Sequence, residues 1–431
     1  MIDLTPRRSY FHEASDDPAL SGHGGLVLVG ELVARTGLID RLDAAINGVR
    51  AFKQRQRGLT AGELLVALAE SNLIGGDHLI HLDELRADSA GAELRAVAKP
   101  PAPTTAGQLL QRLCLRQCQA ALAALAEVGN HLDRELGLPL EGPIMLDLDS
   151  TGTEVYGGQE LAEFSYAGVL NCGSLLATWS QRRRVLAAEL RPGAGSDKPL
   201  AARLLLRALK ALPQGHGQVS VRADSGFYCL ELMEACRRHR LDFSISVPRY
   251  QSMWKARRHT VPYSWHPALG MPGAEIAEVA YTPGGWKQEA LRLLIRRVRI
   301  SAQELSRNPR SRRRRTIPRG QLQLALSGRR EHVYAYSFIL TDRLGDAAEI
   351  ELEHRQRAHI EERIKDAKNG CGLHHLPMRS ASANRSWQTA SIIATNLLSM
   401  ISAVQAQENQ RALVQLAAQA EEEEDLIRPP A

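Results

Sequence analysis

The succession of segments over residues 143–248 constrains the fold of this chain most. Short apolar or alternating runs, which are typical of strands, come first, and helix and strand patterns then follow in turn. The order β-β-β-α-β-α-β predicts an α/β domain. The predicted strands and helices, in chain order, are PIMLDLDST, SLLATWS and RRVLAAEL as strands, KPLAARLLLRALKAL as a helix, QVSVRAD as a strand, FYCLELMEACRRHR as a helix and LDFSISVP as a strand.

The rest of the chain surrounds this α/β segment with regions of different character. At 431 residues the chain exceeds one ordinary core, so we expect two or three domains. The predicted divisions are an N-terminal tail over 1–22, an all-helical region over 23–140, the first part of an α/β core over 141–248, a mostly β insertion with an arginine loop over 249–335, the second part of the core over 336–410, and an acidic, disordered tail over 411–431.

Several classes of protein are excluded by composition and by local patterns. The N-terminus has no apolar run of the secretory type, and the uncharged stretch 387–407 is interrupted by Ser, Thr, Asn and Gln, which favours a buried helix over a membrane span. We therefore expect a cytoplasmic protein without membrane contact. The six cysteines form no Cys-x-x-Cys pair. His78 and His81 form a His-x-x-His pattern, but no third ligand is nearby in the sequence, so no zinc site is predicted.

The positive charge of the chain is concentrated in one segment. Residues 306–319 carry seven arginines and no acid, and without these seven the net charge of +6 becomes −1. A local basic excess favours contact with a polyanion such as nucleic acid, although a solvated arginine loop is the plainer alternative. The predicted phosphate-binding residues of this segment are Arg312, Arg313, Arg314 and Arg315.

Acidic residues occur at two predicted strands, where an unpaired buried charge is costly. Asp147 and Asp149 lie two residues apart and share a face of the first strand, and Asp149 is expected at its carboxyl end. Asp224 ends the alternating strand QVSVRAD in the same way. Carboxyl ends of strands in α/β sheets are where ligands bind, although each aspartate could instead cap a helix or a turn.

A charged stripe is predicted on one helix near the C-terminus. In HRQRAHIEERIKDAK, the residues His354, Arg357, Glu361 and Lys368 have helical spacing, and apolar residues form an adjoining stripe. Salt bridges in water would explain the stripe taken alone. However, Glu361 could also converge with Asp149 and Asp224 on Mg²⁺, which prefers oxygen ligands. Two such ions can hold the attacking and departing oxygens of a phosphodiester.

With these residues in place, the sequence resembles bacterial insertion-sequence transposases of the DDE type, which have a ribonuclease-H-like catalytic core. More narrowly, it resembles the group with the signature Tyr-x2-Arg-x3-Glu-x6-Lys, of which three of four residues match here in His354-x2-Arg357-x3-Glu361-x6-Lys368, with His in place of Tyr. The Asp-Ser-Thr at 149–151, the strand-end Asp224, the insertion before the glutamate and the helix NRSWQTASIIATNLL extend the likeness over nearly the whole chain.

The resemblance implies a ribonuclease-H-like mixed sheet flanked by helices and a helical DNA-binding region over 23–140. It implies catalysis by Asp149, Asp224 and Glu361 with two Mg²⁺ ions, for which Mn²⁺ can substitute, while Asp147 is the alternative first aspartate. Arg357, Lys368 and His354 are then expected to contact DNA phosphates. The implied partners are the element's terminal inverted repeats and target DNA, bound by a homodimer at the nucleoid. The candidates for holding a flipped base are Trp254, Trp265 and Trp286.

Two other readings of these patterns remain. One is a transposase-derived, sequence-specific DNA-binding protein that no longer cleaves, which the His354 substitution leaves open. The other is a metal-dependent nuclease that cuts DNA but does not join it to a target. The favoured prediction is a cut-and-paste DNA transposase that catalyses phosphodiester hydrolysis and transesterification.

Overall fold

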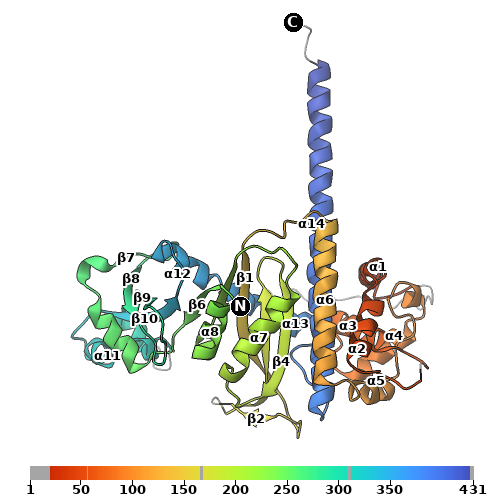
Figure 1. Ribbon diagram of the computed structural model, residues 1–431, viewed down its shortest axis with the longest axis horizontal. Coiled ribbons are helices and arrows are strands. Elements are labelled where there is room, and N and C mark those ends of the chain that lie inside the picture. Colours follow the sequence, from red (N-terminus) through yellow and green to blue (C-terminus); the bar gives the residue numbers. More distant parts are fainter. Residues whose placement is uncertain (1–19, 56, 166–167, 308–311, 428–431) are drawn as a thin grey trace, which may run out of the picture.

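The computed structural model describes residues 20–427 apart from 56, 166–167 and 308–311. Figure 1 shows three parts next to one another: the N-terminal helices at one end, a helix-flanked sheet in the middle, and the strands and short helices of the insertion at the other end. A long last helix, α14, runs beside the middle part and extends beyond the body.

The N-terminal part is helical, as predicted. Its longer helices share one apolar core with the first half of α14, and Leu64, Leu68 and Trp387 are fully buried there. Thr60 begins α3 with a capping box, because its side chain accepts from the Glu63 amide while the Glu63 carboxylate accepts from the Thr60 amide. The elements are α1 (Leu26–Thr36), α2 (Leu38–Val49), α3 (Ala61–Leu73), η1 (Leu79–His81), α4 (Leu82–Ala87), η2 (Ala90–Glu93), α5 (Pro103–Leu110) and α6 (Leu115–Glu135).

The middle part confirms the predicted ribonuclease-H-like sheet. Strands β4, β3 and β1 are antiparallel neighbours, and β5 and β6 follow in parallel with β1. Leu175 and Leu176 belong to different core clusters, so helices cover both faces of the sheet. The elements are β1 (Ile144–Glu154), β2 (Glu163–Phe164), β3 (Leu170–Trp179), β4 (Arg184–Pro192), α7 (Lys198–Ala211), β5 (Val219–Ala223), η3 (Ser225–Phe227), α8 (Leu230–Arg238) and β6 (Asp242–Ser246).

The insertion differs from the mostly β region that was predicted. Its strands β8 and β9 continue the core sheet through β10, which pairs with β6 on one side and β9 on the other. Short helices account for the remainder, because segments such as RGQLQLAL are rich in good helix formers. The elements are α9 (Gln251–Ala256), η4 (Arg257–His259), η5 (Pro262–Ser264), β7 (His266–Pro267), β8 (Ala274–Tyr281), β9 (Leu291–Ser301), α10 (Ala302–Arg307), η6 (Arg312–Thr316), α11 (Arg319–Leu326) and β10 (His332–Thr341).

The predicted helix over 354–368 is two helices, α12 (Ala347–Arg355) and α13 (Ala358–Gly370), and this corrects the single stripe. At the junction the Arg357 amide donates to the His354 carbonyl, three residues back, which tightens the turn. His354 consequently faces β6, whereas Arg357, Glu361 and Lys368 belong to the α13 side of the break.

The last helix, α14 (Ala381–Ile427), is longer than predicted, since it continues through the acidic segment that was expected to be a disordered tail. Its first half packs on α3, α6 and β4. Over Ala381–Leu413 this helix has the length and apolar character that a membrane span requires, and half of its most apolar window is buried in the protein. Core helices of soluble proteins have the same properties, so the helix is weak evidence for a membrane.

Candidate active site

Two neighbouring parallel strands bring the first two acids together. Leu148 of β1 pairs with Ala223 of β5 in the last pair of their ladder; Asp149 is the next residue of β1, and Asp224 is the first residue after β5. The prediction that Asp149 ends its strand is wrong, because β1 continues to Glu154 along β3. Only the pairing of β1 with β5 ends after Leu148, and Asp149 and Asp224 lie next to each other where the two chains separate.

Helix α13 brings the third acid to the same place. Its apolar face, including the buried Ile360 and Ile364, packs against the core. Arg357, just before the helix, lies with Nη1 3.4 Å from an Asp149 carboxylate oxygen and Nη2 3.8 Å from a Glu361 carboxylate oxygen. The Glu361 side chain is 68% exposed, whereas that of Asp149 is 11% exposed. One guanidinium therefore lies between a buried carboxylate and an accessible one.

The pKa of Asp149 is shifted mainly by burial. Burial raises the pKa of Asp149 to about 6, and the negative charges of Asp224 and Glu361 act in the same direction. Arg357 and the Ser150 amide oppose the shift without cancelling it. Burial likewise raises the pKa of Asp224, against the effect of Arg357. Two buried aspartates whose pKa values are raised, beside one arginine, have capacity for additional positive charge.

A fourth carboxylate, Asp197, adjoins the group, and sequence reasoning missed it. Its oxygens accept hydrogen bonds from the Ser150 hydroxyl at 2.9 Å and from Arg191 Nε at 2.6 Å. A Cβ on Gly226 would lie 2.7 Å from Asp197 Oδ2 and 3.1 Å from Asp224 Oδ1, so both carboxylates border the space beside that glycine. Asp197 follows no strand directly and precedes α7, so its position is that of a helix cap. Only the fold places it here.

Asp147, the alternative first aspartate, has a different environment. Arg222 on β5 grips it with two hydrogen bonds of 2.7 and 2.8 Å, and both side chains are almost completely buried. The same arginine also donates to the Ser180 hydroxyl and to the Glu353 carbonyl. Asp147 is thus a neutralised structural acid, and Asp149 is the better candidate for metal binding.

Of the predicted phosphate contacts on this side, Lys368 and His354 are placed very differently. Lys368 is half-buried, and its Nζ donates to the Gly152 carbonyl of β1 at 2.7 Å, three residues past Asp149. His354 is buried, and its two ring nitrogens lie 2.9 Å from the hydroxyls of Ser244 and Ser246. Burial and nearby arginines lower the pKa of His354 to about 3. This placement contradicts a phosphate-binding role for His354, because the ring is neutral and both nitrogens are occupied.

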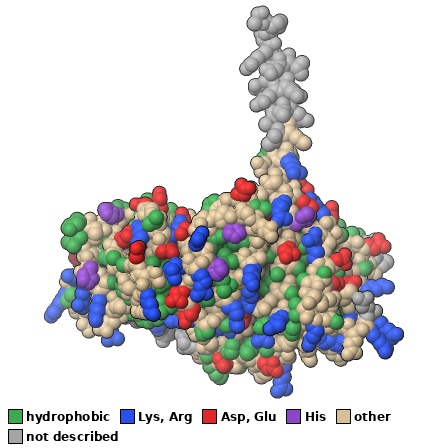
Figure 2. Space-filling view, in the orientation of Figure 1, with side chains coloured by type: hydrophobic (Ala, Val, Ile, Leu, Met, Phe, Trp, Pro, Cys, Tyr) green, Lys and Arg blue, Asp and Glu red, His purple; other side chains and the backbone are tan. Residues whose placement is uncertain are grey.

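The arginine segment lies in the insertion, around η6 and α11, away from α13 in Figure 1. Arg313 pairs with Glu304 at 2.5 Å, and Arg314 donates to the Leu305 carbonyl. The side chain of Arg312 lies outside the described residues. Arg313 and Arg315 are exposed. Figure 2 shows lysine and arginine side chains spread over the insertion, the core and the N-terminal part of this face.

The three tryptophans of the insertion all take part in packing. Trp254 makes edge contacts with the rings of Tyr336 and Phe338, and Trp265 lies under the guanidinium of Arg297 at 4.0 Å. Trp286 is buried, and its ring nitrogen donates to a backbone carbonyl. Trp265, partly exposed, is the one whose ring already binds a cation on its face.

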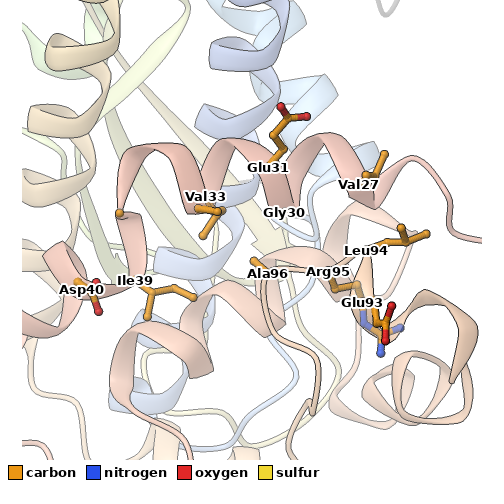
Figure 3. Close-up of a pocket in the computed structure, with 12 residues that line it drawn as sticks. Val27, Gly30, Glu31, Val33, Ile39, Asp40, Glu93, Leu94, Arg95 and Ala96 are labelled. Carbon is orange, nitrogen blue, oxygen red and sulfur yellow. The ribbon is translucent and has the colours of Figure 1, made fainter.

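A hollow of about 660 Å³ lies far from the acids, between α1, α2 and residues 93–96 (Figure 3). Its charged residues are Glu31, Asp40, Glu93 and Arg95, and the guanidinium of Arg95 is buried against Asp88. An excess of acid makes this hollow unsuitable for a nucleic-acid phosphate. We therefore place the candidate active site at the acids of β1, β5 and α13.

A ribonuclease-H-like sheet with acids gathered at adjacent strands and on the following helix defines a class of metal-dependent phosphodiester-cleaving enzymes. The family model described as transposase DDE domain group 1 matches residues 13–310, which is more than half of the chain. The protein therefore belongs to the DDE transposases, enzymes of DNA strand cleavage and transfer that use divalent metal ions. The matched range includes Asp149 and Asp224 and ends before Glu361, so Glu361 is assigned on the geometry of α13.

Other comparisons are more distant. No curated protein sequence matches the chain. Among solved structures, the chain is similar to a chain of the cryo-EM structure of the piggyBac transposase synaptic complex with hairpin DNA. The sequence identity is 11%, the TM-score is 0.43, and the alignment covers 97% of this chain and 83% of that chain.

Proposed function

We propose that this transposase cuts the terminal inverted repeats of an insertion sequence and joins the freed ends to target DNA, with Asp149, Asp224 and Glu361 as the catalytic acids. The observation that carries the proposal is the shared position of Arg357. It lies within 4 Å of Asp149 and Glu361, yet it leaves the pKa of Asp149 raised to about 6. Asp147, two residues away on the same strand, is instead fully paired with Arg222.

The residues present fit divalent metal ions of the Mg²⁺ type. All the candidate donors are carboxylate oxygens, which hard cations prefer, and their uncompensated charge favours a cation. Asp149, Asp224 and Glu361 would hold two Mg²⁺ ions, and Mn²⁺ would substitute, since it also accepts oxygen ligands. Bound ions of this kind supply Lewis acidity to the scissile phosphate and lower the pKa of the attacking water.

Arg357, just before α13, and Lys368 within it position the DNA strand. Arg357 Nη1 is a buried donor that has no hydrogen-bond partner among the described residues, so it can bind a phosphate oxygen when the acids are neutralised by metal. The Lys368 ammonium group donates to the Gly152 carbonyl of β1, three residues past Asp149. In the DNA complex, a phosphate next to the scissile bond would accept a hydrogen bond from the same ammonium group. These two residues would fix the scissile bond against the acids.

The proposed reaction has two steps, hydrolysis and strand transfer. In hydrolysis, a water oxygen bonds to phosphorus, the 3′-oxygen leaves, and the products are a 5′-phosphate and a free 3′-hydroxyl. In transfer, that hydroxyl attacks a target phosphodiester, and the target's own 3′-oxygen leaves with a proton. We propose double-stranded DNA as the partner in both steps and a homodimer as the assembly that holds two ends, with the N-terminal helices and the arginine segment contributing DNA affinity.

The test uses the purified full chain and DNA that carries the ends flanking its gene, with Mg²⁺ or with EDTA. We expect Mg²⁺-dependent cuts at the repeat ends that are lost in Glu361→Gln while DNA binding is kept. Glu362→Gln is the matched control, because it removes the same charge one position along α13, about 100° around the helix, and it should cut normally.

The outcomes separate the alternatives. Binding to the repeats without cutting in Mg²⁺ or Mn²⁺ would identify a DNA-binding protein derived from a transposase. Cutting without joined product, when a target plasmid is present, would identify a nuclease. Equal cutting by wild type and Glu361→Gln would refute the assignment of the third acid.

A further inference from the structure

Three consecutive arginines lie where the turn after β3 enters β4, and two of them share one acid. Arg182 Nε lies 2.9 Å from a carboxylate oxygen of Asp133 on α6, and Arg184 donates to both oxygens of the same buried carboxylate. Arg183 lies between these two residues. Among the described residues, its side chain has no hydrogen-bond or ion-pair partner.

The backbone of Arg183 adopts a conformation that an L side chain disfavours. Its φ is 57°, in the left-handed region, and its amide donates to the Ser180 carbonyl at 3.2 Å to close the turn. Glycine is the usual residue at a left-handed position of a hairpin turn, because a Cβ is crowded there. The turn alone therefore does not explain an arginine at this position, and a strained residue of this kind points to a role for its side chain.

Arg183 borders a hollow of about 170 Å³ between α13 and α14. The Ser399 hydroxyl of α14 donates to the Arg183 carbonyl at 2.8 Å and so fixes the turn beside this hollow. Arg363 of α13 borders the hollow as well, and its side chain likewise has no ion-pair or hydrogen-bond partner in the described part of the chain. Asp366, the acid of the lining, is exposed and forms an ion pair with neither arginine.

Two cations at one hollow repel each other. Burial and the charge of Arg183 lower the pKa of Arg363, and nearby acids oppose this shift without cancelling it. An anion between the two guanidinium groups would remove the repulsion and accept hydrogen bonds from both. The planar donor fork of arginine matches the oxygens of a phosphate group.

The hollow lies on the flank of α13 opposite to the candidate active site. Glu361 follows the buried Ile360 by one residue, and Arg363 precedes the buried Ile364 by one residue. At 100° per residue, Glu361 and Arg363 therefore lie on opposite flanks of the buried stripe. A helix with its side chains is about 10–12 Å across. One DNA strand presents a phosphate about every 3.4 Å along the duplex axis, so a strand held at Glu361 reaches the other flank of α13 within about three or four nucleotides.

We propose that Arg183 and Arg363 bind a DNA backbone phosphate about three or four nucleotides from the scissile bond. This inference rests on the proposed function, because it takes double-stranded DNA as the partner. A phosphate contact carries no base information, so it fixes the DNA across α13 and adds the same affinity on every sequence.

The test measures binding of the full chain to DNA that carries the ends flanking its gene, in EDTA and over a range of salt concentrations. The double variant Arg183→Gly with Arg363→Gln should bind about 10–100-fold more weakly, because charged hydrogen bonds are lost. The slope of log K against log salt should become smaller by about 0.9, the share of one phosphate. Unrelated DNA of the same length should lose the same factor of affinity.

Two further variants separate a binding role from a structural one. Arg183→Gly alone should leave the melting temperature unchanged or higher, because glycine adopts the left-handed conformation without strain. A lower melting temperature would assign Arg183 to the stability of the turn and count against the proposal. Arg238→Gln is the control for charge, since it removes an exposed arginine at the end of α8, on the other face of the sheet, and should leave the affinity and the slope unchanged.

Unchanged affinity and slope in the double variant, while wild type binds DNA, would overturn this proposal and leave the proposed function intact. If wild type bound no DNA, both proposals would fall. Inorganic phosphate is the second probe. If it raised the melting temperature of wild type but not of the double variant, while both bound DNA equally, the hollow would be a site for a small anion and not for DNA.

Discussion

Asp147 and Asp149 lie two residues apart on the same face of β1, but their carboxylates have different environments. At Asp147, one arginine binds one carboxylate through two short hydrogen bonds, and both side chains are at most 5% exposed. At Asp149, one arginine is shared with Glu361 at 3.4 and 3.8 Å, and Asp224 and Asp197 stand nearby. The charge of Asp147 is thus neutralised by Arg222, whereas the carboxylates around Asp149 carry more negative charge than Arg357 can neutralise.

This difference shows what separates a structural acid from a functional one. A buried pair that satisfies every lone pair contributes to a stable sheet, and breaking it leaves an uncompensated charge. An acid with too little positive charge around it destabilises the fold without metal and gains stability when a cation binds. The comparison therefore predicts that equal substitutions at the two positions have opposite consequences.

The largest effect is expected for activity at Asp149. Asp149→Asn should abolish Mg²⁺-dependent cleavage, by about 1,000-fold or more, because it removes a metal ligand and with it the stabilisation of transition-state charge. Binding to repeat DNA should remain. The rate of nicking of labelled repeat ends measures this effect. Residual cleavage within tenfold of wild type would mean that Asp149 is not a metal ligand and that its role does not differ from that of Asp147.

At Asp147, a substitution is expected to lower the free energy of unfolding. Asp147→Asn should destabilise the protein by about 3–5 kcal/mol, because Arg222 stays buried without its partner charge. Chemical denaturation of the metal-free protein gives the free energy of unfolding. Asp149→Asn serves as the matched control and should be neutral or stabilising. A reversed order of the two variants would contradict the comparison.

The pH dependence of stability sharpens the same contrast. The pKa of Asp149 is raised from 3.8 to about 6, so the folded state holds its proton more tightly than the unfolded state. The resulting stabilisation is present below pH 3.8 and is lost as pH rises through about 6, and for this shift it amounts to at most about 3 kcal/mol. Unfolding free energies of wild type and Asp149→Asn in chelator should therefore diverge between pH 4 and 6. A constant difference across that window would argue against the shift.

The smallest effect is expected from the arginine segment. Replacing Arg312 through Arg315 with alanine should weaken DNA binding and flatten its salt dependence. The full loss of four phosphate contacts would change the slope of log K against log salt by about 3.6. Because Arg314 is held by the Leu305 carbonyl and Arg313 pairs with Glu304, we expect a smaller change. Filter-binding at several salt concentrations measures it, and an unchanged slope would remove this segment from the DNA interface.

Sequence patterns predicted much of the fold but fewer of its contacts. Period-2 and helical patterns located β1, β5, α7 and α8 correctly, since burial of alternating faces leaves a direct trace in the sequence. The insertion was mispredicted because helix propensity in short arginine-rich segments competes with strand patterns. The break between α12 and α13 has no Pro or Gly in the sequence to mark it, and it coincides with the tertiary contacts of His354 with β6 and of Arg357 with Asp149.

The sequence by itself determined the alternation of strands and helices over residues 143–248 and the spacing of Arg357, Glu361 and Lys368, because these depend on local periodicity. Only the tertiary structure decided that Arg222 neutralises Asp147 and not Asp149, that Asp197 adjoins the acids, and that His374 meets Asp77 across the chain. These outcomes depend on the register of β1 against β5 and on the packing of segments hundreds of residues apart. Charge pairing over such separations is set by geometry in space, which no local pattern encodes.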